Sequence, residues 1–151
     1  MIFSGNQYHL FDTNQNAYPK EKMTEKQLIN PKGSEHIYQS MQFSQAIKYK
    51  NTIWVSGQVG VDENFKVGKG IEEQTQMAFQ NLEKVLKEAG SGLKDIVELV
   101  TYHTSMKEIG GFSKVKAKFI PENYPAWTAV GVTELVLPDL LVEIRATAVI
   151  D

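Results

Sequence analysis

The chain has 151 residues, no cysteine and a formal net charge of -2 at pH 7. This length favours a single domain, and the lack of cysteine excludes a disulfide framework, a thiolate nucleophile and a cysteine-based zinc site. The slightly acidic balance weighs against a nucleic-acid binder that relies on bulk charge. The start of the chain lacks the pattern of a signal peptide, and no stretch is apolar enough to span a bilayer, so a cytoplasmic location is expected.

Residues 1–35 differ in composition from the rest of the chain. They are rich in Asn, Gln and Lys and show no sustained helical or strand period. We predict an N-terminal extension that is either flexible or laid across a neighbouring surface, with Met23 as a candidate alternative start. Residues 36–151 are predicted to form one domain without internal repeats.

Regular patterns begin at Phe43. Residues 43–61 contain two short β-rich runs around a Lys50-Asn51 turn, which predicts a hairpin. Residues 70–90 predict a helix with acidic residues in its first turn and Gly90 just past its end. The stripe that this helix would bury consists of Ile71, Thr75, Ala78, Leu82, Val85 and Ala89.

The second half of the chain continues with a strand, a helix and two further strands. Residues 95–106 predict a strand, and residues 110–120 predict a helix with Phe112, Val115 and Phe119 on one side. Strands are then predicted around Trp127 and over residues 140–150. This order indicates an α+β fold with both helices on one face of the sheet.

Alternation assigns the faces of the last two strands. In the strand around Trp127, the β-branched side is predicted to pack under the helices, so that Trp127 points away from them. In the last strand, Glu143, Arg145 and Thr147 lie opposite the apolar positions. The helix-free face would then be neither fully apolar nor freely solvated, which indicates a subunit contact or a pocket.

Four segments together resemble a known family in order and spacing. They are SQAIKYKNTIWVSGQVGVD, EEQTQMAFQNLEKVLKEAG, PAWTAVGVTEL and LVEIRATA. They resemble the Rid family (reactive intermediate deaminases, YjgF/L-PSP), over about residues 36–150, and are closer to the YjgH-like branch that lacks the RidA arginine. The resemblance implies a chorismate-mutase-like fold, with a mixed sheet and two helices on one face. It also implies a homotrimer whose sheets form a central barrel with clefts between subunits.

The resemblance further implies an activity. RidA-type members hydrolyse 2-imino acids or their enamine tautomers to 2-oxo acids and ammonia. A glutamate on the last strand positions the attacking water, and it matches Glu143, which would act as the general base. The alternative for Glu143 is a surface or interface carboxylate paired with Lys or Arg.

Other site residues match the family unevenly. Ser56, Gly57 and Gln58 match its SGQ motif, although a glycine that simply ends a strand explains Gly57 equally well. Phe43 stands where a tyrosine is usual, and Ala129 replaces a small polar or sulfur-containing residue. All five residues are expected to line the substrate-binding cleft.

Trp127 is the main departure from the family pattern, because it stands where an arginine binds the substrate carboxylate. An indole offers one neutral N–H in place of two charge-assisted hydrogen bonds. Arg145 could supply a relocated guanidinium or instead form an ion pair between subunits, and His103 could enter the cleft as a donor or acid or be structural. The most economical account is a planar or apolar ligand without a carboxylate, selected by a cleft that Trp127 lines.

Three functions follow from these observations. The first is an imine or enamine hydrolase with altered substrate choice, the second is a non-catalytic trimer that binds a small metabolite, and the weakest is an endoribonuclease. Whether the chain is an enzyme is left open. The three histidines are spaced too far apart to suggest a metal site, and we expect no cofactor and no nucleic-acid or membrane partner. Lys114, Lys116 and Lys118 are predicted to spread around a solvated helix.

Overall fold

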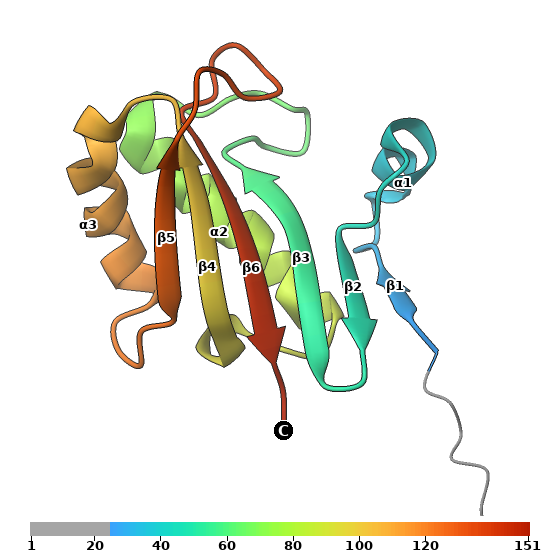
Figure 1. Ribbon diagram of the computed structural model, residues 1–151. Helices are drawn as coiled ribbons and strands as arrows, with labels where there is room; N and C mark the ends of the chain where they lie inside the picture. The colour runs from blue at the N-terminus through green and yellow to red at the C-terminus, as the bar shows by residue number, and fades with distance from the viewer. Residues whose placement is uncertain (1–24) are drawn as a thin grey trace, which may run out of the picture.

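A computed structural model describes residues 25–151 of the chain. Residues 1–24, which include Met23 and most of the predicted extension, lie outside the described residues. The described part forms one six-stranded sheet with helices packed on it (Figure 1). In chain order the elements are β1 (Gln27–Ile29), α1 (Glu35–Met41), β2 (Ala46–Tyr49), β3 (Thr52–Val59), α2 (Gly70–Glu88), the 3-10 turn η1 (Leu93–Asp95), β4 (Ile96–His103), the 3-10 turn η2 (Met106–Glu108), α3 (Ile109–Phe119), β5 (Ala126–Gly131) and β6 (Val142–Val149).

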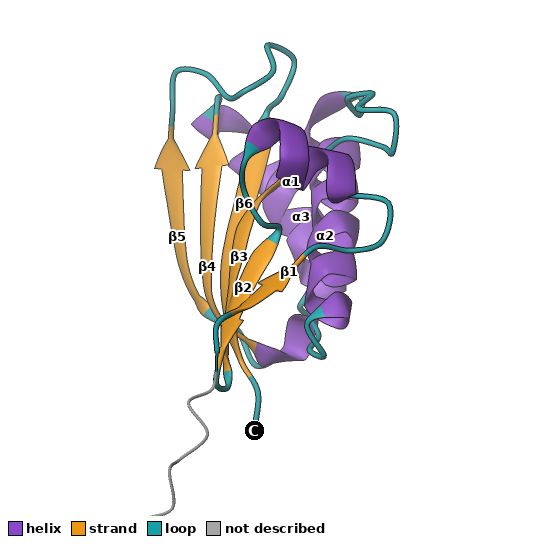
Figure 2. Cartoon of the chain, turned by 90° about the vertical axis from the view of Figure 1, so that its right-hand side faces the viewer, coloured by secondary structure: helices purple, strands orange, loops and turns teal. Residues whose placement is uncertain are grey.

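The sheet is mixed, and its strand order is β1-β2-β3-β6-β4-β5. All neighbouring strands are antiparallel except β4 and β5, which are parallel. The long helices α2 and α3 both lie on one face of this sheet (Figure 2). The α+β prediction with both helices on one face is therefore confirmed. Within residues 25–151, no helix is long and apolar enough to cross a membrane.

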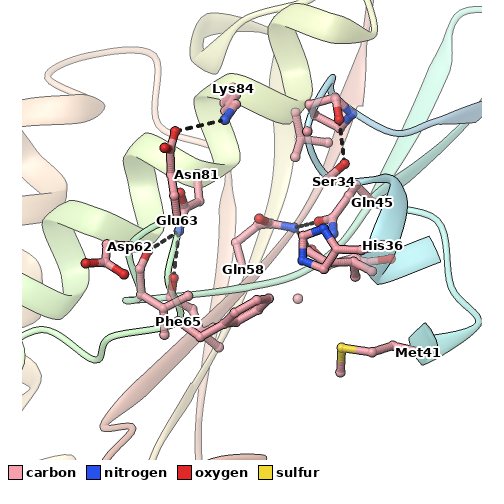
Figure 3. A pocket seen from close by; sticks show the side chains of 18 of the residues that line it. Ser34, His36, Met41, Gln45, Gln58, Asp62, Glu63, Phe65, Asn81 and Lys84 are labelled. Atoms are coloured by element: carbon pink, nitrogen blue, oxygen red, sulfur yellow. Dashed lines mark hydrogen bonds and ion pairs between the residues drawn. The ribbon is translucent and has the colours of Figure 1, made fainter. Parts of the chain in front are cut away.

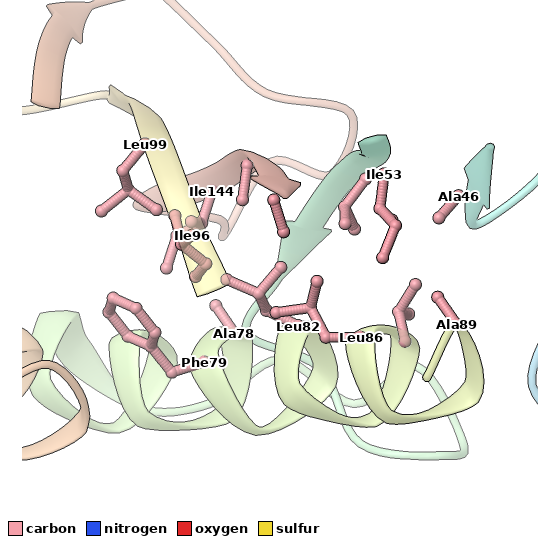
Figure 4. Packing of buried hydrophobic residues seen from close by; sticks show 14 of the residues in the cluster. Ala46, Ile53, Ala78, Phe79, Leu82, Leu86, Ala89, Ile96, Leu99 and Ile144 are labelled. Carbon is pink, nitrogen blue, oxygen red and sulfur yellow. The ribbon is translucent and has the colours of Figure 1, made fainter. Parts of the chain in front are cut away.

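The core lies between α2 and the sheet. Phe79, Leu82 and Leu86 of α2 are completely buried and face apolar side chains of the strands, among them Ile53 and Ile144 (Figure 4). Each such fully buried side chain contributes about 1.5–3 kcal/mol through removal of apolar surface from water. The predicted stripe is confirmed except that Ile71 is only partly buried. Gly90 follows the helix with a φ of 80°, the left-handed conformation expected just past a helix end.

The predicted hairpin is β2 and β3, and Lys50 in its turn has a positive φ of 54°. β2 pairs with β3 only as far as Val55. Beyond that point the register between β3 and β6 shifts, between Val55 and Gln58, which marks a β-bulge. The Ser56 N–H still donates to the carbonyl of Gln45 at 2.9 Å, so the edge without a strand partner consists of residues 57–59.

Apart from the two 3-10 turns, two elements were not predicted. β1 lies inside the segment predicted as an extension, yet it pairs with β2, and Ile29 belongs to the hydrophobic core. The sheet therefore begins before residue 36. The short helix α1 follows β1 at the same edge of the molecule (Figure 1) and buries none of its residues. Its residues carry no apolar stripe long enough to reveal it in the sequence.

The prediction that Trp127 points away from the helices is wrong. β5 pairs in parallel with β4 so that Leu99 lies opposite Trp127, and Leu99 is fully buried under the helices. Side chains opposite each other in register share a face, so Trp127 lies on the helix side. Its ring packs against Phe112 of α3 at 5.6 Å between centroids, and the Lys116 Nζ lies 4.7 Å above it. The β-branched positions of β5 are exposed because β-branching reflects fit to a pleated surface and not burial.

Trp127 belongs to a polar cluster beneath α3. Its Nε1–H donates to the Thr101 Oγ1 at 3.0 Å, and the same oxygen lies 2.8 Å from the His103 Nε2. His103 is completely buried, with the Phe112 ring edge-on to it, and its Nδ1 has no hydrogen-bond partner among the described residues. Burial lowers the pKa of His103 and keeps it neutral. The idea that His103 enters a cleft as a donor or acid is therefore wrong, and its role is structural.

The burial of neutral His103 predicts a dependence of stability on pH. Because its pKa is lower in the folded chain than the ordinary 6.5, its contribution to stability is fully present above that value and is lost as the pH falls through the folded pKa. We expect the melting temperature of the wild type to fall between pH 7 and pH 5, and that of His103→Gln to fall less. The exposed His36→Gln is the matched control and should follow the wild type. Parallel curves for wild type and His103→Gln would contradict this account.

Candidate functional site

A pocket of about 1000 Å³ opens along the free edge of β3. Its walls come from α1, from the loop that follows β3, from α2 and from β6 (Figure 3). Five residues that were predicted from the sequence to belong to one site line this pocket together. They are Phe43, Ser56, Gly57, Gln58 and Glu143.

Glu143 is an acidic group of this pocket that lies directly against β3. It lies on β6 between two completely buried residues, Val142 and Ile144, and points to the opposite face from them. Among residues 25–151, no side chain or backbone group forms a hydrogen bond or ion pair with its carboxylate. Its partial burial raises its pKa above the ordinary value. Glu143 is thus a half-buried carboxylate without a charge partner among the described residues, which is the environment of a group that accepts protons.

Gly57 makes the position of Glu143 possible. A Cβ atom added to Gly57 would overlap the Oε1 of Glu143 and would lie 2.6 Å from its Cδ. The carboxylate therefore rests directly on the backbone of β3. Since Gly57 does not have a positive φ, the glycine is required here for close approach and not for a turn.

Ser56 and Gln58 hold the pocket floor together. The Gln58 Nε2 donates to the Gln45 Oε1 at 3.0 Å and to the carbonyl of Ser56 at 3.1 Å. The Ser56 hydroxyl donates to the carbonyl of Ser44 at 2.7 Å. These bonds attach β3 to residues 44–45 after regular pairing with β2 has ended. The two side chains therefore shape the pocket and also leave acceptor oxygens on its floor.

Four other predicted residues do not meet this pocket within one chain. Trp127 and Ala129 lie on the helix side of β5, at the other end of the sheet. Arg145 shares the face of Glu143, as predicted, but it is exposed, lines no part of the pocket and forms no ion pair within residues 25–151. His103 is buried under α3.

The sequence did not reveal several lining residues. Asn81 of α2 donates to the carbonyls of Val59 and Val61, at 3.0 and 3.1 Å, and so fixes the chain where β3 leaves the sheet. His36 of α1 and Phe65 of the loop after β3 also line the pocket, and their rings contact each other edge-on (Figure 3). No sequence signal marks the α1 contribution, because α1 has no buried face of its own.

The pocket can do simple acid–base chemistry on a bound small molecule. Among residues 25–151, its ionisable lining groups are three carboxylates, two lysines and His36, and no cation pairs with Glu143. Such a carboxylate can take a proton from a water molecule held between it and an electrophilic carbon. In the part of the chain that the structure describes, no three His, Asp or Glu residues lie close enough to hold a metal ion.

Comparisons with known proteins agree with this fold. The family described as Endoribonuclease L-PSP matches residues 33–150. The RutC family protein YjgH of Escherichia coli K12 is 33% identical over 126 residues, which cover 82% of this chain and 96% of that protein. The 2-iminobutanoate/2-iminopropanoate deaminase of Dermatophagoides farinae is 31% identical over 111 residues, which cover 72% of this chain and 86% of that protein.

Solved structures extend the agreement to three dimensions. The structure of protein YJGH matches with a TM-score of 0.76 at 32% identity and covers 83% of this chain and 97% of that chain. The four sequence segments, the mixed sheet and the two covering helices therefore indicate the same family. The chain belongs to the Rid family, also known as the YjgF or L-PSP family.

Proposed function

We propose that this protein hydrolyses imines or enamines to carbonyl compounds and ammonia. The observation that carries the proposal is the half-buried Glu143 carboxylate, which is unpaired within the described part of the chain and is held against Gly57 inside the pocket. The name of a relative, 2-iminobutanoate/2-iminopropanoate deaminase, supports the same reaction class. The fold alone would not support this reaction class, because one fold serves many functions.

The proposed chemistry needs one proton acceptor and one water. Glu143 takes a proton from water while the water oxygen attacks the imine carbon, and the electron pair of the C=N bond moves to nitrogen. Glu143 then returns the proton to that nitrogen. In the tetrahedral carbinolamine, Glu143 then transfers the hydroxyl proton to the nitrogen. The C–N bond breaks as the C=O bond forms, so that R₂C=NH and H₂O give R₂C=O and NH₃.

Trp127 supports an altered choice of substrate. It occupies the position of the arginine that, by resemblance, binds a substrate carboxylate in RidA-type members. Its single N–H is already donated to Thr101 at 3.0 Å. The indole therefore has no free donor for a ligand carboxylate, and we propose that the preferred imine carries none.

The proposal includes a homotrimer with its sheets around a central barrel. The sheet face without α2 and α3 exposes large apolar side chains, among them Leu28, Trp54 and Val97. Exposed apolar groups gathered on one face are typical of subunit contacts. In such an assembly, Trp127 and Ala129 on the edge strand β5 would complete the pocket of a neighbouring subunit.

The two other functions receive less support. A trimer that binds a metabolite without turnover would use the same pocket, and turnover assays separate it from the hydrolase. RNA cleavage is disfavoured because three carboxylates and two lysines line the pocket. The lysines of α3 form no free basic stripe, since Lys114 pairs with Glu72 at 2.9 Å and Lys116 lies over Trp127.

The first test compares wild type with Glu143→Gln in the release of ammonia from freshly generated imines with and without a carboxylate. We expect the wild type to act on the carboxylate-free imines and the variant to lose about 10²–10⁴-fold in rate, since the amide cannot accept the proton. Glu98→Gln is the matched control, because Glu98 is an exposed carboxylate on the neighbouring strand β4, outside the pocket. Equal rates for wild type and Glu143→Gln would refute the assignment.

A second prediction concerns stability. The pKa of Glu143 is higher in the folded chain than its ordinary value of 4.5, so the stability contributed by its protonated form is fully present below that value and is lost as the pH rises through the folded pKa. Glu143→Gln should therefore raise the melting temperature at pH 7, and this gain should disappear near pH 4. A variant that is less stable than the wild type at pH 7 would show that Glu143 has a favourable partner.

Gly57→Ala provides a third prediction. The added methyl group would force the Glu143 carboxylate off the backbone of β3, and a displacement of about 1 Å at a reacting group can cost about 10²-fold in rate. Gly110→Ala is the control, because a Cβ at Gly110 meets no atom within 4 Å. Circular dichroism should show that both variants fold, and unchanged turnover by Gly57→Ala would mean that the contact between Gly57 and Glu143 is not used.

A further inference from the structure

The loop after β3 holds an aromatic residue in an unfavourable backbone conformation. Val61 and Val67 form a β-bridge, and the turn between them contains hydrogen bonds from the Asp62 N–H to the carbonyl of Lys66 and from the Phe65 N–H to the carbonyl of Asp62, each 3.0 Å long. Phe65 has a φ of 60° in this turn. A bulky residue rarely adopts this conformation, which glycine or asparagine would adopt with less strain.

Phe65 also gains little from burial. Its side chain is 46% exposed, so packing in the core does not explain why a phenylalanine stands at this position. The ring projects into the pocket and meets His36 of α1 edge-on, with 5.7 Å between ring centroids (Figure 3). Strained residues that persist at a binding site indicate a functional use of the side chain.

The helix α1 shows the same pattern. It contributes no buried residue to the core, yet three of its side chains, His36, Ile37 and Met41, line the pocket. Met41 is 52% exposed. The two ends of α1 are held in place separately. At the start, the Ser34 hydroxyl donates to the carbonyl of Pro31 at 2.6 Å, and at the end, Gln42 has a φ of 58°. The chain therefore presents apolar surface to the pocket from two elements that the core does not require.

The charges around this surface are unsuited to an anionic ligand. The Lys84 Nζ lies 3.8 Å from the Glu63 Oε1, and the Asp62 Oδ1 accepts the N–H groups of Asn64 and Lys66. Lys32 is the remaining lysine in the pocket lining of the described chain, and three carboxylates outweigh the two lysines. An uncharged or cationic ligand is favoured over a carboxylate.

We propose that Phe43, His36, Met41 and Phe65 form an apolar compartment of the pocket, which holds a flat aryl or arylalkyl substituent of an imine whose C=N carbon lies at Glu143. This inference rests on the proposed imine hydrolysis and adds the class of substrate. The size of the pocket, about 1000 Å³, agrees with it, because an imine of a few atoms would leave most of that space to water. Aromatic rings and a thioether are suited to packing on a planar apolar group.

The chemistry also places the reaction in a sequence. An aryl-substituted imine without a carboxylate forms when an oxygen-using amine oxidase acts on a primary amine, so that RCH₂NH₂ and O₂ give RCH=NH and H₂O₂. Hydrolysis at Glu143 then yields RCHO and NH₃. An amine-oxidising enzyme must therefore supply the substrate, and an aldehyde-consuming reaction must remove the product.

The test uses imines generated in the assay from benzylamine and from propylamine by an amine oxidase. In the wild type we expect a higher kcat/KM for the benzyl imine. In Phe65→Gly, which removes the ring and relieves the positive φ, this preference should fall about tenfold, the range that one hydrophobic contact gives in discrimination. Tyr38→Ala is the matched control, because Tyr38 is an exposed aromatic residue of α1 outside the pocket lining, and it should keep the wild-type preference.

An NMR titration with benzyl alcohol and 1-propanol separates this inference from the proposed function. Benzyl alcohol should bind the wild type and bind Phe65→Gly about tenfold more weakly, whether or not imines turn over. Turnover without a preference for the benzyl imine, or a preference that survives in Phe65→Gly, overturns the proposed apolar compartment. Either result leaves the proposed imine hydrolysis standing. Selective binding without turnover supports the compartment and overturns the hydrolase, and the absence of both overturns both.

Discussion

The alternation of side chains along β6 is the constraint on which the rest of this molecule depends. β6 lies between β3 and β4 and hydrogen-bonds to both of them. Val142 and Ile144 are completely buried under the helices, so the residue between them must point to the other face. A shift of one residue would move every buried apolar side chain of β6 to the face away from the helices. The direction of Glu143 is therefore held by the same burial that stabilises the core.

The pocket exists because the neighbouring strand is interrupted. β2 ends its pairing with β3 at Val55, and the bulge that follows changes the register of β3 against β6. Gly57 in this bulge leaves room for a carboxylate, and Asn81 satisfies two carbonyls at the point where the chain leaves the sheet. The rigid strand β6 and the irregular strand β3 thus meet at one place. As a result, the Glu143 carboxylate lies next to an accessible backbone edge of β3. This arrangement suits a reaction that needs water held beside a base.

The opposite end of the sheet has a different character. Trp127, Thr101 and His103 form a connected polar group under α3, and Phe112 packs against the two rings. Trp127 is therefore part of the packing of this chain. Replacing Trp127 would alter the surface beneath α3. It would also alter the side of β5 that the proposed trimer presents to a neighbouring subunit. Trp127 therefore has two roles, one in packing under α3 and one in the proposed choice of substrate. A change at this position affects both the packing and the ligand contact.

The sequence by itself determined the elements with strong periods and the faces of the last strand. The 3.6-residue stripe of α2, the alternation of β6 and the turn at Lys50 all depend on neighbours along the chain, and the structure confirms them. Resemblance to the family brought Phe43, Ser56, Gly57, Gln58 and Glu143 together, and they share one pocket.

The tertiary structure alone decided the rest. The face of Trp127 follows from the register of β5 against β4, which no local pattern of β5 contains. The burial of His103 depends on α3 lying over it, and β1 becomes a strand only because the edge of β2 is available for pairing. Phe65 and His36 meet across segments that have no common period. A sequence specifies the period of a strand or helix locally, whereas the partner, the register and the covering element are set by packing between distant parts of the chain.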